Sequence, residues 1–511
     1  MSTAVLSDQS RKPAEPAALG GLAGQAAERR AKRDALQALG INPYPTRFER
    51  SATLAGLHSA HYGLDPDTRT GEVASVAGRV ASMRGHGKLR FATIEDASGA
   101  VQLMFRADHL PADAAAVEAL VDLGDWVGVT GEVITSRRGE LSVDVSGLEI
   151  LSKALRPLPD KRHGLSEAET RYRQREVDLL ANKESRRVFD IRFRTLSILR
   201  DRLEGQGFME VETPILQPQA GGALARPFFT HANALDTEFS LRIAPELYLK
   251  RLVVGGYERV FEVARNFRNE GIDTRHSPEF TSLEAYRAFG DFRDGMDLTE
   301  HLIVEAARGA VGRLEFDFAG QRVDLTPPWP RRDLLDMLEE RLGQRVHPSM
   351  PAEDLRQVCD AHEVPYLPSW GSGKLVFELY DKILMGQTLG PVFIYHYPTE
   401  VSPLARRSLE DPTVTDRFEL VIGGRELANG YSELNDPDEQ AKRFEAEATA
   451  AAGGETEAHP ADAAFVRALE FGLPPTSGIG IGIDRLIMLL AEVPAIRDVI
   501  LFPLMRTEAV S

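Results

Sequence analysis

Between residues 71 and 152 the chain alternates apolar and polar residues in short runs, which limits its fold more than any other feature. Five such runs are separated by turns with glycine or aspartate, among them VASVAGRVASMR, AVQLMF and DWVGVTGEVITS. Alternation with a period of two is typical of strands with one buried face. Five short strands within about 80 residues fit a small closed barrel. We therefore predict such a barrel over residues 71–152.

The segments around this barrel differ from it in composition. Residues 1–25 are rich in Ala, Pro, Ser and Gly, and we expect them to form a disordered tail. A helical segment is predicted over 26–70, and a charged linker with several prolines over 153–185. Residues 186–511 form the largest predicted domain, with a helical insertion around 326–395.

Charge and cysteine content exclude several classes of protein. The chain has 60 basic and 77 acidic residues, a net charge of −17, which argues against a general nucleic-acid coat protein. A local basic patch remains compatible with this charge. The single cysteine, Cys359, cannot form an internal disulfide or a cysteine zinc cluster, which favours a reducing compartment. No apolar run is long enough to span a membrane, and the N-terminus lacks a signal-peptide core. We expect a soluble, cytoplasmic protein.

The segment FRNEGIDTRHSPEF at 267–280 concentrates charged residues without an apolar stripe. Arg268, Glu270, Arg275, His276 and Glu279 lie within a few positions of one another. Such a cluster fits a binding site, and it fits an exposed, salt-bridged loop between strands equally well.

The segment FELVIGGRELANGYSEL at 418–434 carries acidic residues on two predicted strands. A turn at Gly423–Gly424 would bring Glu419 and Glu426 to one side of a hairpin. Paired carboxylates of this kind hold Mg²⁺, which prefers oxygen ligands and bridges phosphates. The alternative is a solvated hairpin without a metal.

The segment GIGIGIDRL at 478–486 places three glycines at alternate positions of one strand. One strand face therefore lacks side chains, which lets a flat ligand lie against the backbone. Asp484 then begins a helix, with Arg485 in its first turn. The spacing differs from that of the GxGxxG dinucleotide loop.

Together these segments resemble the three motifs of class II aminoacyl-tRNA synthetases. The long helix after residue 184 and GFMEVETP resemble motif 1, VFEVARNFRNEGIDTRHSPEFTSLEAY resembles motif 2, and GIGIGIDRL resembles motif 3. Within that class, YPTEVSPLARR, ANGYSELNDP and IRDVILFPLMR resemble blocks of the lysyl enzymes. The resemblance extends over nearly the whole chain from about residue 26.

The resemblance implies an α+β fold, in which an antiparallel sheet flanked by helices forms the catalytic domain. The barrel would be an OB-type anticodon-binding domain for tRNA(Lys), and motif 1 would form a homodimer interface. Arg268 and Arg485 would be catalytic and bind ATP phosphates. Glu419 and Glu426 would hold Mg²⁺, with Glu419 also in the ATP site. The remaining implied ATP ligands are Glu270, His276 and Phe280.

A buried cationic substrate requires carboxylate partners, because an unpaired buried charge is very costly. Candidates in this chain are Glu246, Glu284 and Glu433, with Tyr286 beside them. By resemblance, Glu284 and Glu433 face the ε-ammonium of L-lysine. Glu246 and the backbone of Gly222 hold its α-amino group, and Asn429 its carboxylate.

In the barrel, the family stacks and reads an anticodon base at the positions of Phe91 and Gln102. Phe91 would equally suit the barrel core. The four basic residues at 29–33 fit phosphate contacts. Three alternatives remain open: a lysine ligase with a protein acceptor, a non-catalytic tRNA-binding protein, and an aspartyl or asparaginyl enzyme. The barrel argues against the first, and the intact motif residues argue against the second.

Overall fold

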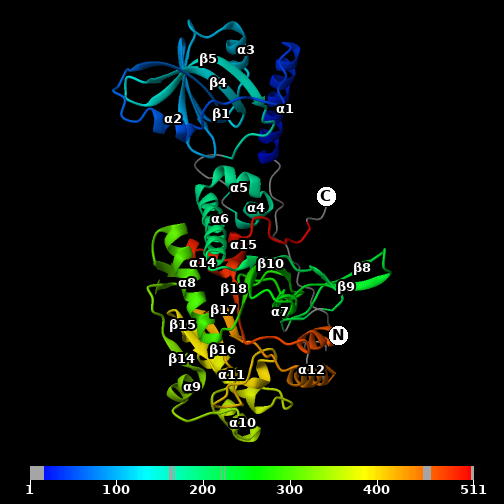
Figure 1. Ribbon diagram of the computed structural model, residues 1–511. Helices are drawn as coiled ribbons and strands as arrows, with labels where there is room; N and C mark the ends of the chain where they lie inside the picture. The colour runs from blue at the N-terminus through cyan, green and yellow to red at the C-terminus, as the bar shows by residue number, and fades with distance from the viewer. Residues whose placement is uncertain are drawn as a thin grey trace, which may run out of the picture. The chain divides into compact units, whose positions relative to one another are not determined.

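The computed structural model of the chain describes residues 17–159, 165, 167–219, 221–223, 225–452 and 462–507. It divides into two compact units, residues 1–164 and 165–511, which we describe separately (Figure 1). Most of the predicted tail at 1–25 lies outside the described residues. None of the helices formed by the described residues combines the length and apolar character that crossing a membrane requires.

The first unit contains the five-stranded barrel, which closes in the order β1–β2–β3–β5–β4. Neighbouring strands are antiparallel except β3 and β5, which are parallel. Alternate residues such as Val76, Ile94, Leu103 and Val143 are fully buried inside it. The predicted barrel is therefore confirmed. Its strands are β1 (Arg69–His86), β2 (Leu89–Glu95), β3 (Ala100–Arg106), β4 (Trp126–Thr135) and β5 (Leu141–Ser152).

Helix α1 packs against this barrel through one apolar and two basic side chains. It runs over Ala17–Ala38, so it begins nine residues before the predicted start at residue 26. Leu36 is fully buried in the barrel core. Arg29 donates hydrogen bonds to backbone carbonyls at 3.0 and 3.1 Å, and Lys32 donates to Asp122 at 2.7 Å. Two of the four basic residues are thus engaged by the barrel. The other helices of the first unit are α2 (Leu54–Ala60) and α3 (Ala112–Glu118).

The second unit is built on an eight-stranded sheet in the order β14–β15–β16–β17–β18–β11–β10–β6. Its six central strands are antiparallel, as predicted, whereas the outermost pair at each edge is parallel. The strands are β6 (Met209–Glu210), β10 (Arg259–Phe267), β11 (Glu279–Ala288), β14 (Arg331–Asp333), β15 (Val392–Tyr395), β16 (Arg417–Ile422), β17 (Arg425–Ser432) and β18 (Thr476–Gly482).

One face of this sheet forms the main core. Leu283 and Ala285 of β11, and Ile479 and Ile481 of β18, pack with helices α6 (Lys183–Glu204), α8 (Phe292–Val311) and α14 (Ile483–Ala491). Successive side chains of a strand point to opposite faces. The alternate residues, including Glu284 of β11, therefore lie on the opposite face, and that face carries the polar groups.

The remaining helices and small sheets surround this sheet. In the predicted insertion at 326–395, helices α9–α11 have an apolar core of their own, and the flanking β14 and β15 join the main sheet. The predicted linker contains α4 and α5. The remaining helices and strands of the second unit are α4 (Ala168–Arg173), α5 (Arg175–Ala181), α7 (Glu246–Val254), α9 (Leu334–Leu342), α10 (Ala352–Ala361), α11 (Ser372–Ile383), α12 (Pro437–Ala452), α13 (Ala463–Leu469), α15 (Ile496–Val499), β7 (Leu216–Gln217), β8 (Phe229–Ala232), β9 (Thr237–Leu241), β12 (Glu315–Phe318), β13 (Gln321–Asp324), η1 (Met385–Gln387) and η2 (Thr399–Val401).

Candidate active site

A cavity of about 180 Å³ opens on the polar face of the sheet in the second unit. Its walls come from β10, β11, β17, β18, the loop between β10 and β11, and the start of α14. Segments that lie more than 200 residues apart in sequence therefore meet here. Eight of the residues predicted to bind a ligand line it: Arg268, Glu270, His276, Phe280, Glu284, Glu426, Asn429 and Arg485.

Arg268 follows β10 and lies over an aromatic ring. Its guanidinium carbon is 4.9 Å from the ring centre of Phe280, a cation–π arrangement. Its buried Nε has no hydrogen-bond partner among the described residues. Burial lowers the pKa of Arg268, while the carboxylates of Glu426, Glu270 and Glu284 oppose that change. Because arginine remains charged in proteins, this is an incompletely paired cation suited to an anionic ligand.

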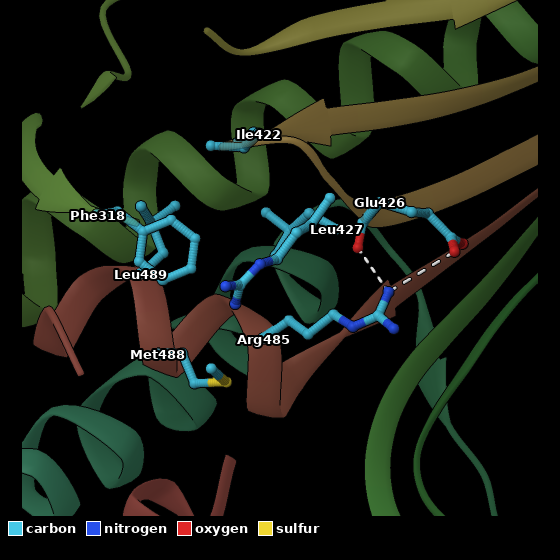
Figure 2. A pocket seen from close by; sticks show the side chains of 8 residues that line it. Phe318, Ile422, Glu426, Leu427, Arg485, Met488 and Leu489 are labelled. Atoms are coloured by element: carbon cyan, nitrogen blue, oxygen red, sulfur yellow. Dashed lines mark hydrogen bonds and ion pairs between the residues drawn. The ribbon is translucent and has the colours of Figure 1, made fainter. Parts of the chain in front are cut away.

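Arg485 is fixed in the first turn of α14 by the β17 strand. Its guanidinium donates a 2.7 Å hydrogen bond to the carbonyl of Glu426, and its Nη1 lies 3.6 Å from a carboxylate oxygen of the same residue (Figure 2). Arg485 also borders a second cavity of about 10 Å³, whose other lining residues include Phe318 and Met488. That space admits about one water molecule, so it is no ligand site.

A buried ion pair anchors the helix that carries Arg485, and the sequence reasoning did not find it. Asp484 accepts a 2.6 Å bond from Arg192 of α6 and a 2.7 Å bond from the backbone N–H of Thr281. Arg192 also donates to the hydroxyl of Thr281 at 3.0 Å. These bonds tie α6, β11 and α14 together beside Phe280 and Arg485. In sequence, only the acidic residue before Arg485 hinted at this network.

The hairpin of β16 and β17 has the predicted turn at Gly423 and Gly424, both with positive φ angles of 61° and 71°. Glu419 pairs with Asn429 across the hairpin, and Asn429 donates a 3.4 Å bond to Glu426. Burial raises the pKa of Glu419 to about 7, Arg417 opposes that rise, and Glu426 adds to it. The two carboxylates therefore lie close enough to repel each other. Glu419 does not line the cavity itself.

The two carboxylates fit a divalent cation. Glu419 Oε2 is buried without a hydrogen-bond partner among the described residues. Within that part of the chain, no group of three or more His, Cys, Asp or Glu side chains converges on a metal position. Mg²⁺ usually needs only one or two carboxylates together with waters and substrate phosphates. This donor set therefore suits Mg²⁺ bound with a phosphate ligand.

The loop between β10 and β11 is organised by an aspartate that the sequence reasoning missed. Asp273 accepts bonds from the backbone N–H groups of Arg275 and His276 at 2.6 and 2.8 Å. Its other oxygen lies 2.9 Å from Nδ1 of His276. The His276 hydrogen bond is the main cause that lowers the pKa of Asp273 to about 2. The ring of His276 is thereby oriented at the cavity wall, where Glu270 also lies.

A cluster of buried acidic side chains, Glu246, Glu284 and Glu433, continues from the cavity along the same face of the sheet, and we call it the acidic pocket. Glu284 lines the cavity, is buried, and accepts a 3.1 Å hydrogen bond from the hydroxyl of Tyr286. Burial raises the pKa of Glu284 to about 8, and the charge of Glu246 adds to the rise. Glu433 is also buried, and burial raises its pKa well above the usual value. The three carboxylates proposed for the lysine pocket thus influence one another, and Glu246, Glu433 and Tyr286 stand outside the cavity lining.

A buried lysine that the sequence reasoning overlooked lies among these carboxylates. Lys250 Nζ is 2.6 Å from Glu246 Oε1 and forms an ion pair with Glu433. The hydroxyl of Tyr431 donates to the same oxygen of Glu246. A glutamate four residues before a lysine on a helix is a recognisable pair. That spacing in ELYLK was the available signal, although it does not reveal burial.

The alternate glycines of β18 run along the whole site. A Cβ atom at Gly478 would lie 1.9 Å from Glu433 Oε1 and 2.7 Å from the Tyr286 ring, so no side chain fits there. At Gly480 it would meet Asn429 at 3.1 Å. Gly482 lies beside Arg485. The bare strand face therefore connects the acidic end of the site to its arginine end.

Gly222 brings a backbone segment against the acidic pocket. Its φ angle of 88° lies in the left-handed region, which favours glycine. A Cβ atom at this position would lie 3.0 Å from the Cβ of Glu246. The backbone of Gly222 therefore lies beside Glu246.

The two predicted anticodon residues lie on one face of the barrel in the first unit. Phe91 of β2 is half-buried and is not part of the barrel core. Gln102 of β3 is buried and donates a 2.8 Å bond to Ser142. Arg84 connects the two, because it donates to Gln102 at 2.5 Å and lies 5.8 Å from the Phe91 ring centre. Arg84 was not singled out in the sequence, although its place near Phe91 is typical of a basic-aromatic binding face.

Two family models match the chain, one for each unit. The model described as tRNA synthetases class II (D, K and N) matches residues 167–506. The model described as OB-fold nucleic acid binding domain matches residues 74–151. The first covers more than half of the chain, including every residue that lines the cavity.

Curated relatives are similar over almost their whole length. A protein of Syntrophomonas wolfei named lysine–tRNA ligase is 48% identical over 471 residues, covering 92% of this chain and 94% of the relative. One of Carboxydothermus hydrogenoformans with the same name is 48% identical, with 93% and 96% covered. A third, of Chromohalobacter salexigens, is 50% identical, with 94% and 97% covered.

Proposed function

This chain belongs to the class II tRNA synthetases and, within them, to the lysine–tRNA ligases, and we propose from that membership that it joins L-lysine to tRNA(Lys) with ATP. One observation supports this function above the others. A strand face without side chains connects a cavity lined by three arginines to a cluster of three buried carboxylates. Phosphates suit the first end, and the ammonium groups of lysine suit the second.

At the arginine end, we assign ATP binding to the residues that line the cavity. Arg268 binds the α-phosphate and stabilises the charge that builds there during transfer. Phe280 stacks on one side of the adenine, and Arg485 covers the other side and meets the γ-phosphate. Glu270 and His276 complete the site. The incompletely paired guanidinium of Arg268 supports its assignment.

At the acidic end, we assign the recognition of lysine. Glu284 and Glu433 face the ε-ammonium group, with Tyr286 holding Glu284 through its hydroxyl. Glu246 and the backbone of Gly222 hold the α-amino group. The carboxylate of lysine lies at Asn429, which places it between the pocket and the phosphates.

The reaction then needs positioning and charge stabilisation more than covalent help from the protein. An oxygen of the lysine carboxylate attacks the α-phosphorus of ATP, and the bond to the bridging β-phosphate oxygen breaks. Pyrophosphate leaves, and lysyl-adenylate remains. A hydroxyl of the 3′-terminal ribose of tRNA next attacks the lysyl carbonyl carbon, and AMP leaves.

We assign Mg²⁺ to Glu419 and Glu426. When bound, the ion neutralises phosphate charge during the transfer. The buried, unpartnered oxygen of Glu419 supports this assignment. Asn429, which pairs with Glu419 and donates to Glu426, orients the two carboxylates.

The barrel is assigned to the anticodon. Phe91 stacks on an anticodon base and Gln102 reads it, with Arg84 supporting both side chains. Arg30 and Arg33 of α1 remain candidates for phosphate contacts. The barrel also disfavours a protein acceptor, since such ligases resemble the catalytic domain alone.

A homodimer through the motif 1 region is supported by exposed apolar side chains. Phe193 of α6, Met209 of β6, Leu216 of β7 and Phe229 of β8 are between 49% and 66% exposed. Large exposed apolar side chains are candidates for an interaction surface. Sedimentation of the purified protein measures this state directly. The cytoplasm is the proposed compartment, in keeping with the one free, buried cysteine.

The function is tested by ATP–pyrophosphate exchange with each amino acid in turn, followed by charging of tRNA. We expect exchange with lysine alone and transfer of lysine to tRNA(Lys). Exchange with aspartate or asparagine would overturn the proposed specificity. Lysine-dependent exchange without charging of any tRNA would favour a protein acceptor, and the absence of both reactions would favour a non-catalytic protein.

A further inference from the structure

Lys250 has the most enclosed charge in the acidic pocket. It lies on α7 with a fully buried side chain, and its ammonium group lies 5.2 Å from the ring centre of Tyr431 and 5.9 Å from that of Phe465. Glu246, one turn earlier on α7, and Glu433, after β17, are its ion-pair partners. A buried ammonium group is tolerated only when it is paired in this way.

The charges around Lys250 nearly balance. From β11, Glu284 and Tyr286 face the same pocket, and Tyr286 and Tyr431 stay neutral because burial raises their pKa values well above 10. With Glu262, which lies opposite Glu284 on the neighbouring strand, four carboxylates therefore stand against three cations: Lys250, the Arg268 side chain that faces Glu284, and Arg242, the ion-pair partner of Glu262. When all of these groups are ionised, which for Glu284 requires a pH above about 8, the pocket keeps one negative charge. Free lysine, with two ammonium groups and one carboxylate, carries one positive charge and neutralises it.

We propose that Lys250 is a positioning residue for the amino-acid substrate, whose internal ammonium group orients Glu246 and Glu433 toward the bound lysine and favours the charged form of Glu433. The proposal rests on the proposed function, because it assigns those two carboxylates to the lysine pocket. Of these two carboxylates, Glu433 depends more clearly on Lys250. Neither of its buried oxygens makes a hydrogen bond of good geometry among the described residues, so its orientation depends on the ion pair with Lys250.

Removal of this cation should change the proton balance of the pocket. Burial raises the pKa of Glu433, and Lys250 opposes that rise more than any other neighbour. Without Lys250, the adjacent carboxylates would repel each other, and one of them would take up a proton at neutral pH. Substrate lysine would then have to displace that proton before it could bind.

The test is Lys250→Met, which keeps an unbranched side chain of similar length without charge. In ATP–pyrophosphate exchange we expect the KM for lysine at pH 7 to rise at least about tenfold, the change that one pKa unit produces. The KM for ATP should stay near the wild-type value. The pH above which the lysine KM stops falling should move upward by about one unit or more. Calorimetry in two buffers should show about one additional proton released on lysine binding.

A double variant, Lys250→Met with Glu246→Gln, restores the balance of charges and serves as the control. Its lysine KM should be raised, because Glu246 is lost, but its pH profile should return to that of the wild type. If Lys250→Met does not fold, the pH profile of the double variant is the test. A double-variant profile displaced from that of the wild type would then overturn the proposal.

Three other outcomes are distinct. If Lys250→Met raises the KM values for lysine and ATP together and leaves the pH profile unchanged, Lys250 has only a structural role and the proposal is wrong. A lysine KM unchanged at every pH would contradict it equally. If the wild type shows no lysine-dependent exchange, the proposed function itself fails, which is evident before any variant is made.

Discussion

Arg268 is the residue whose truncation tests the chemical step most directly. Arg268→Ala removes a guanidinium that has few protein partners, so the fold should tolerate the change. We expect adenylate formation to fall by at least about a hundred- to a thousandfold, because a charge stabiliser of the transition state is lost. ATP–pyrophosphate exchange measures the rate, and thermal unfolding checks the fold.

The matched control for Arg268→Ala lies on the same strand. Arg265 of β10 forms a 3.3 Å ion pair with Glu279, is partly exposed, and does not line the cavity. Arg265→Ala should keep exchange close to the wild-type rate. Near-normal exchange by Arg268→Ala would show that this arginine does not serve the reaction.

Glu284 predicts a pH dependence for lysine binding. Its pKa is raised to about 8, chiefly by burial. Without bound lysine, the Glu284 carboxyl is therefore largely protonated below pH 8. The ε-ammonium of lysine stays charged there and needs the ionised carboxylate. The lysine KM should therefore fall as pH rises from about 6 to 8, by at most about tenfold per unit. Glu284→Gln should flatten this slope, and an unchanged slope would remove Glu284 from the pocket.

The same raised pKa has a consequence for stability, with a defined sign. The folded pKa of about 8 lies above the usual value of 4.5. The contribution of Glu284 to stability is therefore complete below about pH 4.5 and is lost as pH rises through about 8. Lysine should stabilise the protein most near pH 8, where it supplies the missing counter-charge. Thermal unfolding with and without lysine at several pH values measures this.

At single positions, sequence reasoning found side chains with distinctive chemistry but not their partners. Glu284, Asn429 and Arg485, three of the predicted site residues, line one cavity. Arg192 was missed because its partner Asp484 is 292 residues away, and no periodicity records such a pair. Lys250 was missed for a related reason. An i,i+4 pair with Glu246 is usually a solvated surface pair, and only the tertiary fold buries it.

At the level of elements, β18 can be tested through its glycines. Gly478→Ala places a Cβ atom 1.9 Å from Glu433 Oε1 and 2.7 Å from Tyr286. Because β18 is a central strand of the sheet, these two side chains must move instead of the backbone. We expect the lysine KM to rise by at least about tenfold, equivalent to loss of a charge-assisted hydrogen bond. The KM for ATP should change much less.

Gly482→Ala on the same strand provides the comparison. Its Cβ atom would have ordinary contacts, 3.4 Å from the Leu427 carbonyl and 3.8 Å from Arg485. The lysine KM should therefore remain near the wild-type value in this variant. Equal increases in lysine KM from the two substitutions would mean that the strand, and not the Glu433 contact, is the cause.

Elements with a strong local pattern were predicted well. The alternation of β18, the Gly423–Gly424 turn and the barrel strands all appear in the structure. Elements without such a pattern were not. In the motif-1-like segment GFMEVETP only Met209 and Glu210 form a strand, because β6 lies at the edge of the sheet and pairs with β10 alone. On α6, Phe193 is 52% exposed although it is apolar, which fits the homodimer that we propose.

For the whole molecule, the two units differ in the chemistry that they carry. Each unit has an apolar core of its own. Every residue that lines the cavity belongs to the second unit, whereas Phe91, Gln102 and Arg84 belong to the first. Sequence patterns predicted both units, because strand alternation and ordered motifs are local. Their joint action on one tRNA molecule leaves no such local signal and has to be measured.

A truncation in the barrel should separate adenylate formation from tRNA charging. Phe91→Ala removes a half-buried ring that is not part of the barrel core, so the barrel should still fold. Lysine-dependent exchange should remain close to wild type, since the barrel contributes nothing to the cavity. Charging should weaken, because loss of a stacked base costs ~1–3 kcal/mol. Added salt should weaken charging further, since phosphate contacts release counterions.

Met83→Ala, an exposed change on the neighbouring β1, should leave both activities intact. Equal losses in exchange and charging by Phe91→Ala would indicate a destabilised protein, and unchanged charging would show that Phe91 does not contact the anticodon.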